Sequence, residues 1–176
     1  KYIVIARRPF DQYKLIYKIL KIKNDIIFYL EKPLCQNPKK SLEVLNYLHK
    51  KNIVFKVNYI FLHTDWFKII SKIIKKKNNE ITINWKFNNN NLNSWKFKKI
   101  YGGGIIRYYG IQFIAIASIM GFDKCLKSNL KENIKKKFFW NIIFKDKNKN
   151  KLSINFFLNY GEDSFIISNN KNEIIK

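Results

Sequence analysis

Apolar residues in the first third of the chain fall into short uninterrupted runs, separated by amphipathic segments. Three of these runs are typical of buried strands: Tyr2–Ala6, Ile26–Leu30 and Ile53–Phe61. Residues Asp11–Ile22 have the apolar spacing of a helix, and a second helix is expected from Pro38, capped by Asn37, to about Lys50. The order of these elements predicts a parallel sheet covered by helices.

From about residue 63 the pattern changes. Asp65–Lys76 has helical spacing, and the apolar run Gly103–Met120 is expected to form another helix. Glu80–Phe87 alternates apolar and polar residues like a half-buried strand, and Asn88–Lys99 is expected to be a polar loop. Three later runs predict an antiparallel meander: Phe138–Phe144, Leu152–Leu158 and Ser164–Ile167. The second part is therefore expected to be an α/β domain with a largely antiparallel open sheet.

The formal net charge of +23 could reflect a nucleic-acid partner. The basic runs are dispersed, however, and Lys, Asn, Ile, Phe and Tyr are in excess together, as an A+T-rich coding sequence would produce. We therefore interpret the charge as compositional and expect neither a nucleic-acid partner nor a membrane, because no apolar stretch reaches the ~18 residues of a membrane helix. Cys35 and Cys125 have no pairing or metal spacing, which predicts free thiols, no metal site and a cytoplasmic location.

Two motifs carry candidate chemistry. Glu31-Lys32-Pro33 follows a predicted buried strand directly, and the carboxyl ends of strands are where α/β sheets bind ligands. Gly102-Gly103-Gly104 opens the long apolar run, where glycines allow a close backbone approach. All six glycines lie at or after position 102, so no G-x-G-x-x-G phosphate-binding turn precedes them.

These two motifs, at this separation, resemble the Gfo/Idh/MocA family of nicotinamide-dependent oxidoreductases, and the resemblance runs from Tyr2 to about Phe122. It implies that residues 1–62 are the C-terminal part of a Rossmann-like nucleotide-binding domain. Residues 63–176 would be an α/β substrate-binding and dimerisation domain. The missing glycine turn, and the absence of Met at position 1, predict an N-terminal truncation that does not bind NAD(P) tightly.

The resemblance also implies roles for individual residues. Lys32 would act as a proton relay or substrate-orienting cation, with Tyr108 as a second catalytic candidate. The residues expected to contact NAD or NADP are Arg7, Pro9, Gln12, Glu31, Lys32 and Pro33, with Gln12 in place of a family histidine. The residues expected to contact a carbohydrate-like substrate are Trp95, Lys96 and Gln112. Tyr108 and Gln112 replace the family's aspartate and histidine, and Ala115 replaces a further aspartate.

Three hypotheses follow. The chain is a fragment of a NAD(P)-dependent oxidoreductase that acts on a hydroxyl or keto carbon of a sugar, sugar nucleotide or cyclitol. In the family such proteins form homo-oligomers through the open sheet. Alternatively, the substitutions at Tyr108, Gln112 and Ala115 mark a catalytically degenerate member that serves as a binding or assembly subunit. A basic nucleic-acid-binding protein is the least favoured hypothesis.

Overall fold

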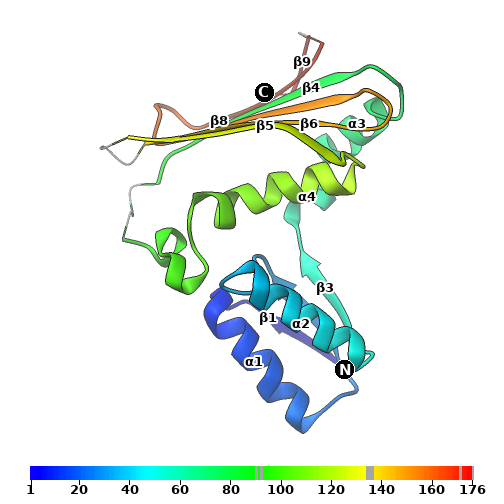
Figure 1. Cartoon of the computed structure of the whole chain (residues 1–176), viewed down its shortest axis with the longest axis vertical. Helices are drawn as coiled ribbons and strands as arrows, with labels where there is room; N and C mark the ends of the chain where they lie inside the picture. Colours follow the sequence, from blue (N-terminus) through cyan, green and yellow to red (C-terminus); the bar gives the residue numbers. More distant parts are fainter. Residues whose placement is uncertain (90, 92, 134–136, 171, 176) are drawn as a thin grey trace. The chain divides into compact units, whose positions relative to one another are not determined.

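The structure, a computed structural model, describes residues 1–89, 91, 93–133, 137–170 and 172–175 (Figure 1). Its elements fall into two units. The first unit comprises Lys1–Ile60 and Asn93–Gln112, and the second comprises Phe61–Leu92 and Phe113–Lys176. The first unit therefore includes a segment from the second half of the chain. A single boundary in the sequence does not separate the two units. The functional assignment of residues 1–62 and 63–176 stays a prediction.

The first unit contains a parallel sheet in the order β1-β2-β3. Its strands are β1 (Tyr2–Ile5), β2 (Ile27–Glu31) and β3 (Val54–Asn58), and its helices are α1 (Pro9–Ile22) and α2 (Pro38–Lys50). The expected elements are confirmed, and Asn37 Oδ1 caps α2 by accepting a hydrogen bond of 2.8 Å from Lys40 N. The third strand ends earlier than expected, because Ile60–His63 forms a 3₁₀ turn, η1.

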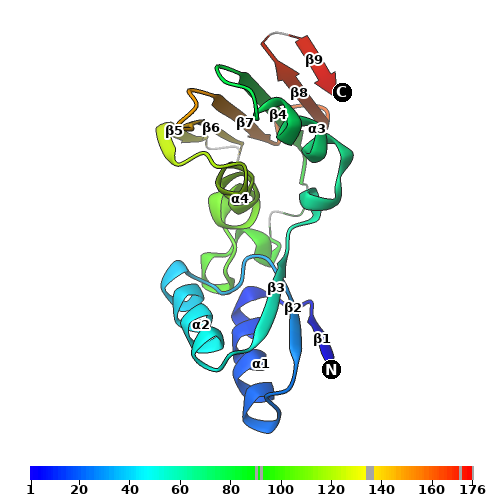
Figure 2. The ribbon, with the colours of Figure 1, turned by 90° about the vertical axis from the view of Figure 1, so that its right-hand side faces the viewer.

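The helices cover only one face of this sheet (Figure 2). Its buried core includes Ile5, Phe28 and Leu30 from the strands, with Ile16 and Leu48 from the helices. On the other face Tyr2 is 72% exposed and Val4 is 74% exposed. The prediction of a parallel sheet covered by helices therefore holds for one face only among the described residues.

The second unit contains a six-stranded mixed sheet in the order β5-β6-β7-β4-β8-β9. The strands are β4 (Glu80–Phe87), β5 (Lys124–Glu132), β6 (Phe138–Lys145), β7 (Lys151–Leu158), β8 (Ser164–Asn169) and β9 (Asn172–Ile175). The expected meander is wrong. The β6 and β7 strands do form an antiparallel pair, but β4 lies between β7 and β8, parallel to β7 and antiparallel to β8. The central position pairs the apolar Ile83 with Ile154 and Ile167, both of which are fully buried.

Two helices, α3 (Asp65–Ile73) and α4 (Ile111–Ile119), lie on one side of this sheet (Figure 1). The Phe113 ring of α4 lies 6.3 Å from Trp140 and 5.8 Å from Phe156, between ring centroids. The opposite face is open, as expected, and carries a row of asparagines. Asn141 Nδ2 donates to Asn155 Oδ1, and Asn155 Nδ2 donates to Asn84 Oδ1, each at 2.8 Å.

The segment between β4 and α4 departs from the expected loop and helix. Residues 90 and 92 lie outside the described part. The segment contains two short 3₁₀ helices, η2 (Trp95–Phe97) and η3 (Lys99–Tyr101). The predicted single helix is divided, because η4 (Ile105–Gly110) is a π-helical turn that leads into α4. Such turns often occur at functional sites.

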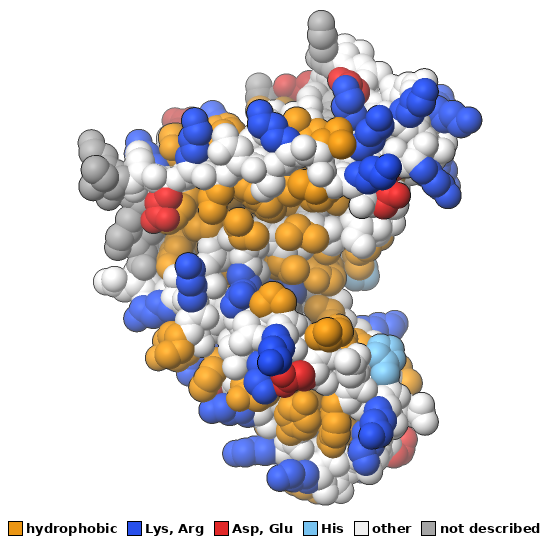
Figure 3. All heavy atoms as spheres, viewed as in Figure 1, with side chains coloured by type: hydrophobic (Ala, Val, Ile, Leu, Met, Phe, Trp, Pro, Cys, Tyr) orange, Lys and Arg blue, Asp and Glu red, His pale blue; other side chains and the backbone are white. Residues whose placement is uncertain are grey.

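Three surface properties bear on the hypotheses. Lys and Arg side chains are scattered over the face in Figure 3 rather than gathered in a stripe. Within the described ranges, no helix is long and apolar enough to cross a membrane, and no cluster of His, Cys, Asp or Glu could hold a metal ion. Cys35 is a buried free thiol and Cys125 is an exposed one.

Candidate active site

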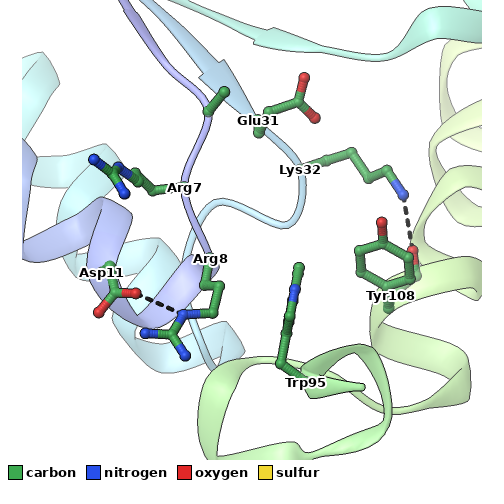
Figure 4. Close-up of a pocket in the computed structure, with 8 residues that line it drawn as sticks. Arg7, Arg8, Asp11, Glu31, Lys32, Trp95 and Tyr108 are labelled. Atoms are coloured by element: carbon green, nitrogen blue, oxygen red, sulfur yellow. Dashed lines mark hydrogen bonds and ion pairs between the residues drawn. The ribbon is translucent and has the colours of Figure 1, made fainter. Parts of the chain in front are cut away.

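A pocket of about 550 Å³ lies in the first unit, where β1 and β2 end (Figure 4). It is lined by Ala6, Arg7, Arg8, Asp11, Glu31, Lys32, Trp95 and Tyr108. Ala6, Arg7 and Arg8 follow β1, and Asp11 lies at the start of α1. Glu31 and Lys32 lie at the end of β2, while Trp95 and Tyr108 come from η2 and η4. The pocket is therefore built at the carboxyl edge of a parallel sheet, the usual ligand position in this class of fold.

Gln12 fixes the turn that carries Lys32. Its side chain is fully buried, and its Nε2 donates to the carbonyl oxygens of Glu31, at 2.8 Å, and Leu34, at 3.0 Å. Its Oε1 accepts a hydrogen bond of 3.0 Å from Glu31 N. Both amide hydrogens are thus used on the backbone on either side of Lys32. As placed, Gln12 braces this turn and does not line the pocket.

Lys32 extends from this turn toward Tyr108. Its Nζ donates to the Tyr108 carbonyl oxygen at 3.0 Å and lies 4.2 Å from the centroid of the Tyr108 ring. Burial lowers the pKa of Lys32 to about 8; Glu31 opposes this decrease, and Lys96 adds to it. A lysine with a pKa in this range can take up and release a proton near neutral pH, which suits it to general acid–base chemistry.

Tyr108 lies between Lys32 and Trp95. The Trp95 ring meets the Tyr108 ring edge-on, with centroids 5.2 Å apart. Burial, with a smaller contribution from Glu31, raises the pKa of the Tyr108 phenol above its ordinary value. A catalytic acid would need a lowered pKa here. Tyr108 is therefore better suited to hydrogen bonding and ring stacking than to releasing a proton.

The glycine motif lets the η2–η4 segment pack against the first sheet's helices and turns. Gly102 has φ +87°, and a Cβ added there would lie 2.7 Å from Pro9 Cβ and 2.9 Å from Gln36 Cα. A Cβ on Gly103 would collide with the Trp95 carbonyl oxygen. The close approach expected for these glycines is therefore made to the protein's own backbone, and it brings Trp95 and Tyr108 to the pocket.

The structure brings together some of the predicted site residues. Those that line the pocket are Arg7, Glu31, Lys32, Trp95 and Tyr108. Those that do not line it are Pro9, Gln12, Pro33, Lys96 and Gln112. Lys96 still lies near, because its Nζ is 5.3 Å from the Tyr108 ring centroid. The predicted cofactor and substrate contacts of all these residues stay predictions.

Sequence reasoning missed Arg8 and Asp11. Arg8 Nε donates to Asp11 Oδ2 at 2.8 Å, and the Arg8 guanidinium carbon lies 5.0 Å from the Tyr101 ring centroid. The signal was present in the sequence, since two adjacent arginines follow the first strand directly in a chain that otherwise uses lysine.

No protein-family model and no curated protein sequence matches this chain. Solved structures do match it. The WlbA (WbpB) dehydrogenase from Thermus thermophilus, in complex with NAD and alpha-ketoglutarate, is 14% identical with a TM-score of 0.76. KijD10, a 3-ketoreductase from Actinomadura kijaniata in complex with NADP and TDP-benzene, is 12% identical with a TM-score of 0.73. Biliverdin reductase from Synechocystis, in complex with biliverdin and NADP⁺, is 11% identical with a TM-score of 0.73.

These matches cover 99%, 97% and 95% of this chain, respectively, but only 59%, 57% and 56% of the three solved chains. The chain thus spans little more than half of their length. At these identities the comparisons establish the fold. The chain has the fold of Gfo/Idh/MocA-type dehydrogenases, as its two motifs indicated.

Proposed function

We propose that the chain is part of a NAD(P)-dependent oxidoreductase that acts on a hydroxyl or keto carbon of a carbohydrate-like substrate. The observation that carries this proposal is Lys32: a partly buried lysine at the carboxyl end of a parallel strand, in a pocket, with its pKa lowered to about 8. A solvent-exposed lysine would have neither the pocket nor the lowered pKa.

The nicotinamide cofactor, when bound, would accept or give up the hydride. Glu31, Lys32 and Arg7 are the pocket residues available to contact it, and the location of the pocket at the strand ends fits such a group. The neutral Lys32 amine would take the hydroxyl proton as the C–H hydride leaves the same carbon, which becomes a carbonyl carbon. In the reverse direction, the Lys32 ammonium would return that proton to the oxygen.

The ligands of the solved neighbours support this class of chemistry. The same WlbA dehydrogenase is also solved with NAD and UDP-GlcNAcA, and KijD10 is a 3-ketoreductase solved with NADP and TDP-benzene. The biliverdin reductase is solved with biliverdin and NADP⁺. A carbohydrate-like substrate is therefore supported by part of this group only, and the neighbours are solved with either NAD or NADP.

The alternative, a catalytically degenerate binding or assembly subunit, is favoured by one observation. The pKa of Tyr108 is raised, so Tyr108 is a poor replacement for the aspartate that the family has beside its lysine.

We also propose that a second copy of the chain packs on the open face of the six-stranded sheet. Two hydrogen bonds already link the three asparagine side chains there, which lowers the number of polar groups that covering this face would leave unsatisfied.

The test is turnover of NAD(P)⁺ by the native full-length protein with a panel of sugars, sugar nucleotides and cyclitols. We expect the Lys32→Met variant to lose about 10²–10⁴-fold in kcat, the usual contribution of a positioned acid–base group. Lys18→Met, on the exposed side of α1, is the matched control and should retain wild-type kcat. An unchanged kcat in Lys32→Met would remove Lys32 from the mechanism. No turnover and no cofactor binding would favour the binding subunit.

A further inference from the structure

The Lys32 amine lies in the pocket without a paired carboxylate. Two neutral groups hold it, since Nζ donates to the Tyr108 carbonyl oxygen at 3.0 Å and lies 4.2 Å from the centroid of the Tyr108 ring. Within the part of the chain that the structure describes, Lys32 forms no ion pair. Lysines that leave water are usually paired with a carboxylate, because an unpaired buried charge is costly. The surroundings of Lys32 therefore stabilise its ammonium less than an ion pair would.

The two carboxylates that line the pocket are bonded to other partners. Glu31 Oε1 accepts a 3.0 Å hydrogen bond from Asn58 Nδ2, and Asp11 forms a 2.8 Å ion pair with Arg8. Glu31 keeps its charge and acts on the pocket lysine only from a distance. The remaining charged residue of the lining, Arg7, is a further cation.

A second lysine lies close to the same aromatic ring. Lys96 Nζ is 5.3 Å from the centroid of the Tyr108 ring, so two amines share one ring. Burial lowers the pKa of Lys32 to about 8, with Glu31 opposing this decrease and Lys96 adding to it. At about pH 8, roughly half of the Lys32 side chains would thus be neutral, against less than about one per cent for an exposed lysine with a pKa of about 10.4.

The pocket leaves room for a reactant next to this amine. In Figure 4, Lys32 extends from the end of β2 to Tyr108, along a pocket of about 550 Å³. That volume is in the range that accommodates a small organic molecule. One N–H of the neutral amine is used on the Tyr108 carbonyl oxygen, and the nitrogen lone pair stays available for a new bond. A desolvated lysine beside another cation is a known form of activated nucleophile.

We propose that Lys32 is a nucleophile that captures an aldehyde or ketone as an imine in this pocket. Its nitrogen bonds to the carbonyl carbon, and one of its protons passes to the carbonyl oxygen. The resulting hydroxyl takes up one more proton and leaves as water, while the nitrogen becomes an iminium. Overall, a lysine ammonium and a carbonyl compound give an iminium and water, without oxidation or reduction. The reaction needs no hydride acceptor, so it does not rest on the proposed oxidoreductase function.

The test is reductive trapping of the folded protein with propanal and cyanoborohydride, which converts the imine into N-propyl-lysine. Mass spectrometry of the intact protein and of its peptides then counts and locates the propyl groups. At about pH 8 we expect Lys32 to be labelled at least about tenfold faster than any other lysine, because far more of it is neutral. Its labelling rate should reach a plateau with a midpoint near pH 8, while exposed lysines continue to gain up to about pH 10.

The matched variants are Lys32→Met, Lys96→Met and Lys18→Met. We expect Lys32→Met to lose the fast labelling entirely, and Lys18→Met, on the exposed side of α1, to leave it unchanged. Lys96→Met removes the second cation, so it should move the Lys32 midpoint to higher pH and slow labelling at pH 7 about twofold or more. A higher pH should restore labelling in Lys96→Met, which a damaged pocket would not allow.

Three results would overturn the proposal: labelling of Lys32 no faster than that of exposed lysines, equal fast labelling in wild type and Lys32→Met, or a midpoint near pH 10. An unchanged midpoint in Lys96→Met would remove Lys96 from the proposal. The outcome is separable from that of the oxidoreductase proposal. Loss of turnover in Lys32→Met without trapping would remove only the imine, and trapping without turnover would remove only the hydride transfer.

Discussion

Among the residues that the structure describes, each unit contains one fully buried amide side chain, and the two amides serve different purposes. Gln12 in the first unit binds the backbone on both sides of Lys32. Asn150 in the second unit joins the β6–β7 turn to its surroundings, because its Nδ2 donates to Ile74 O at 2.9 Å and to Asp146 Oδ2 at 2.8 Å. Its Oδ1 also accepts from Asn79 N at 2.8 Å.

The comparison shows that a buried amide side chain can stabilise either the fold or a functional site. A buried amide must satisfy its donors and acceptors, so it fixes whatever backbone supplies the partners. At Asn150 that backbone is the β6–β7 hairpin turn. None of its residues lines the Lys32 pocket, although Asp146, Lys147 and Asn148 line a second pocket of about 370 Å³. At Gln12 it is the turn that directs the partly buried Lys32 into the first pocket. Buried amides are therefore informative about function only through the residues that they hold.

The strongest way to sharpen this comparison is to remove each amide. We expect Gln12→Leu and Asn150→Leu each to lower the free energy of unfolding by about 3 kcal/mol, since each leaves several buried partners unpaired. Only Gln12→Leu should also slow the trapping of Lys32 by propanal. The measurement is chemical denaturation combined with the trapping assay at a temperature where both variants stay folded. Equal effects on trapping would remove the distinction between the two amides.

A second comparison is between the charged and the neutral form of the Lys32 side chain. The pKa of Lys32 is lowered from 10.5 to about 8 by burial, so the folded state disfavours the charged amine. The resulting loss of stability is fully present below pH 8 and disappears as the pH rises to the unfolded value. We expect Lys32→Met to raise the free energy of unfolding at pH 7 by about 1 kcal/mol, and to lose that advantage above pH 10.

Denaturation of wild type and Lys32→Met at pH 7 and at pH 10.5 measures this effect. A variant that is less stable than wild type at both pH values would mean that the bond to the Tyr108 carbonyl outweighs the burial of the charge. Lys18→Met serves as the control, because its exposed side chain should show no such dependence on pH.

The smallest expected effect on folding concerns the open face of the second unit. The Phe139 and Phe157 rings lie 4.8 Å apart there, beside the asparagine row. We expect Phe157→Glu to shift a homo-oligomer to monomers with little change in the unfolding of the monomer, because the side chain lies on the uncovered face. Sedimentation of wild type and variant measures this shift, with Lys18→Glu, on the exposed side of α1 in the first unit, as the control. A monomeric wild type would contradict an interface at this face.

The local elements of the first unit could be predicted from the sequence because their signals are local. Asn37 before Pro38 defines the start of α2, and the run that ends at Leu30 places Lys32 at a strand end. Strand β5 had no such signal. It is a lysine-rich edge strand that is almost entirely exposed, and it is held by backbone pairing with β6. Nor did alternation along β4 reveal that it lies between β7 and β8.

The sequence by itself determined the helices and strands of the first unit, the position of Lys32 and the presence of two adjacent arginines. The tertiary structure decided what these residues can do. Lys32 has a lowered pKa because the fold buries it in part, next to the Tyr108 carbonyl that accepts its hydrogen bond from 76 residues away. Gln12 is a brace rather than a pocket residue because the turn after β2 folds back onto α1. Burial and long-range pairing depend on which distant segments meet, and local patterns do not encode that.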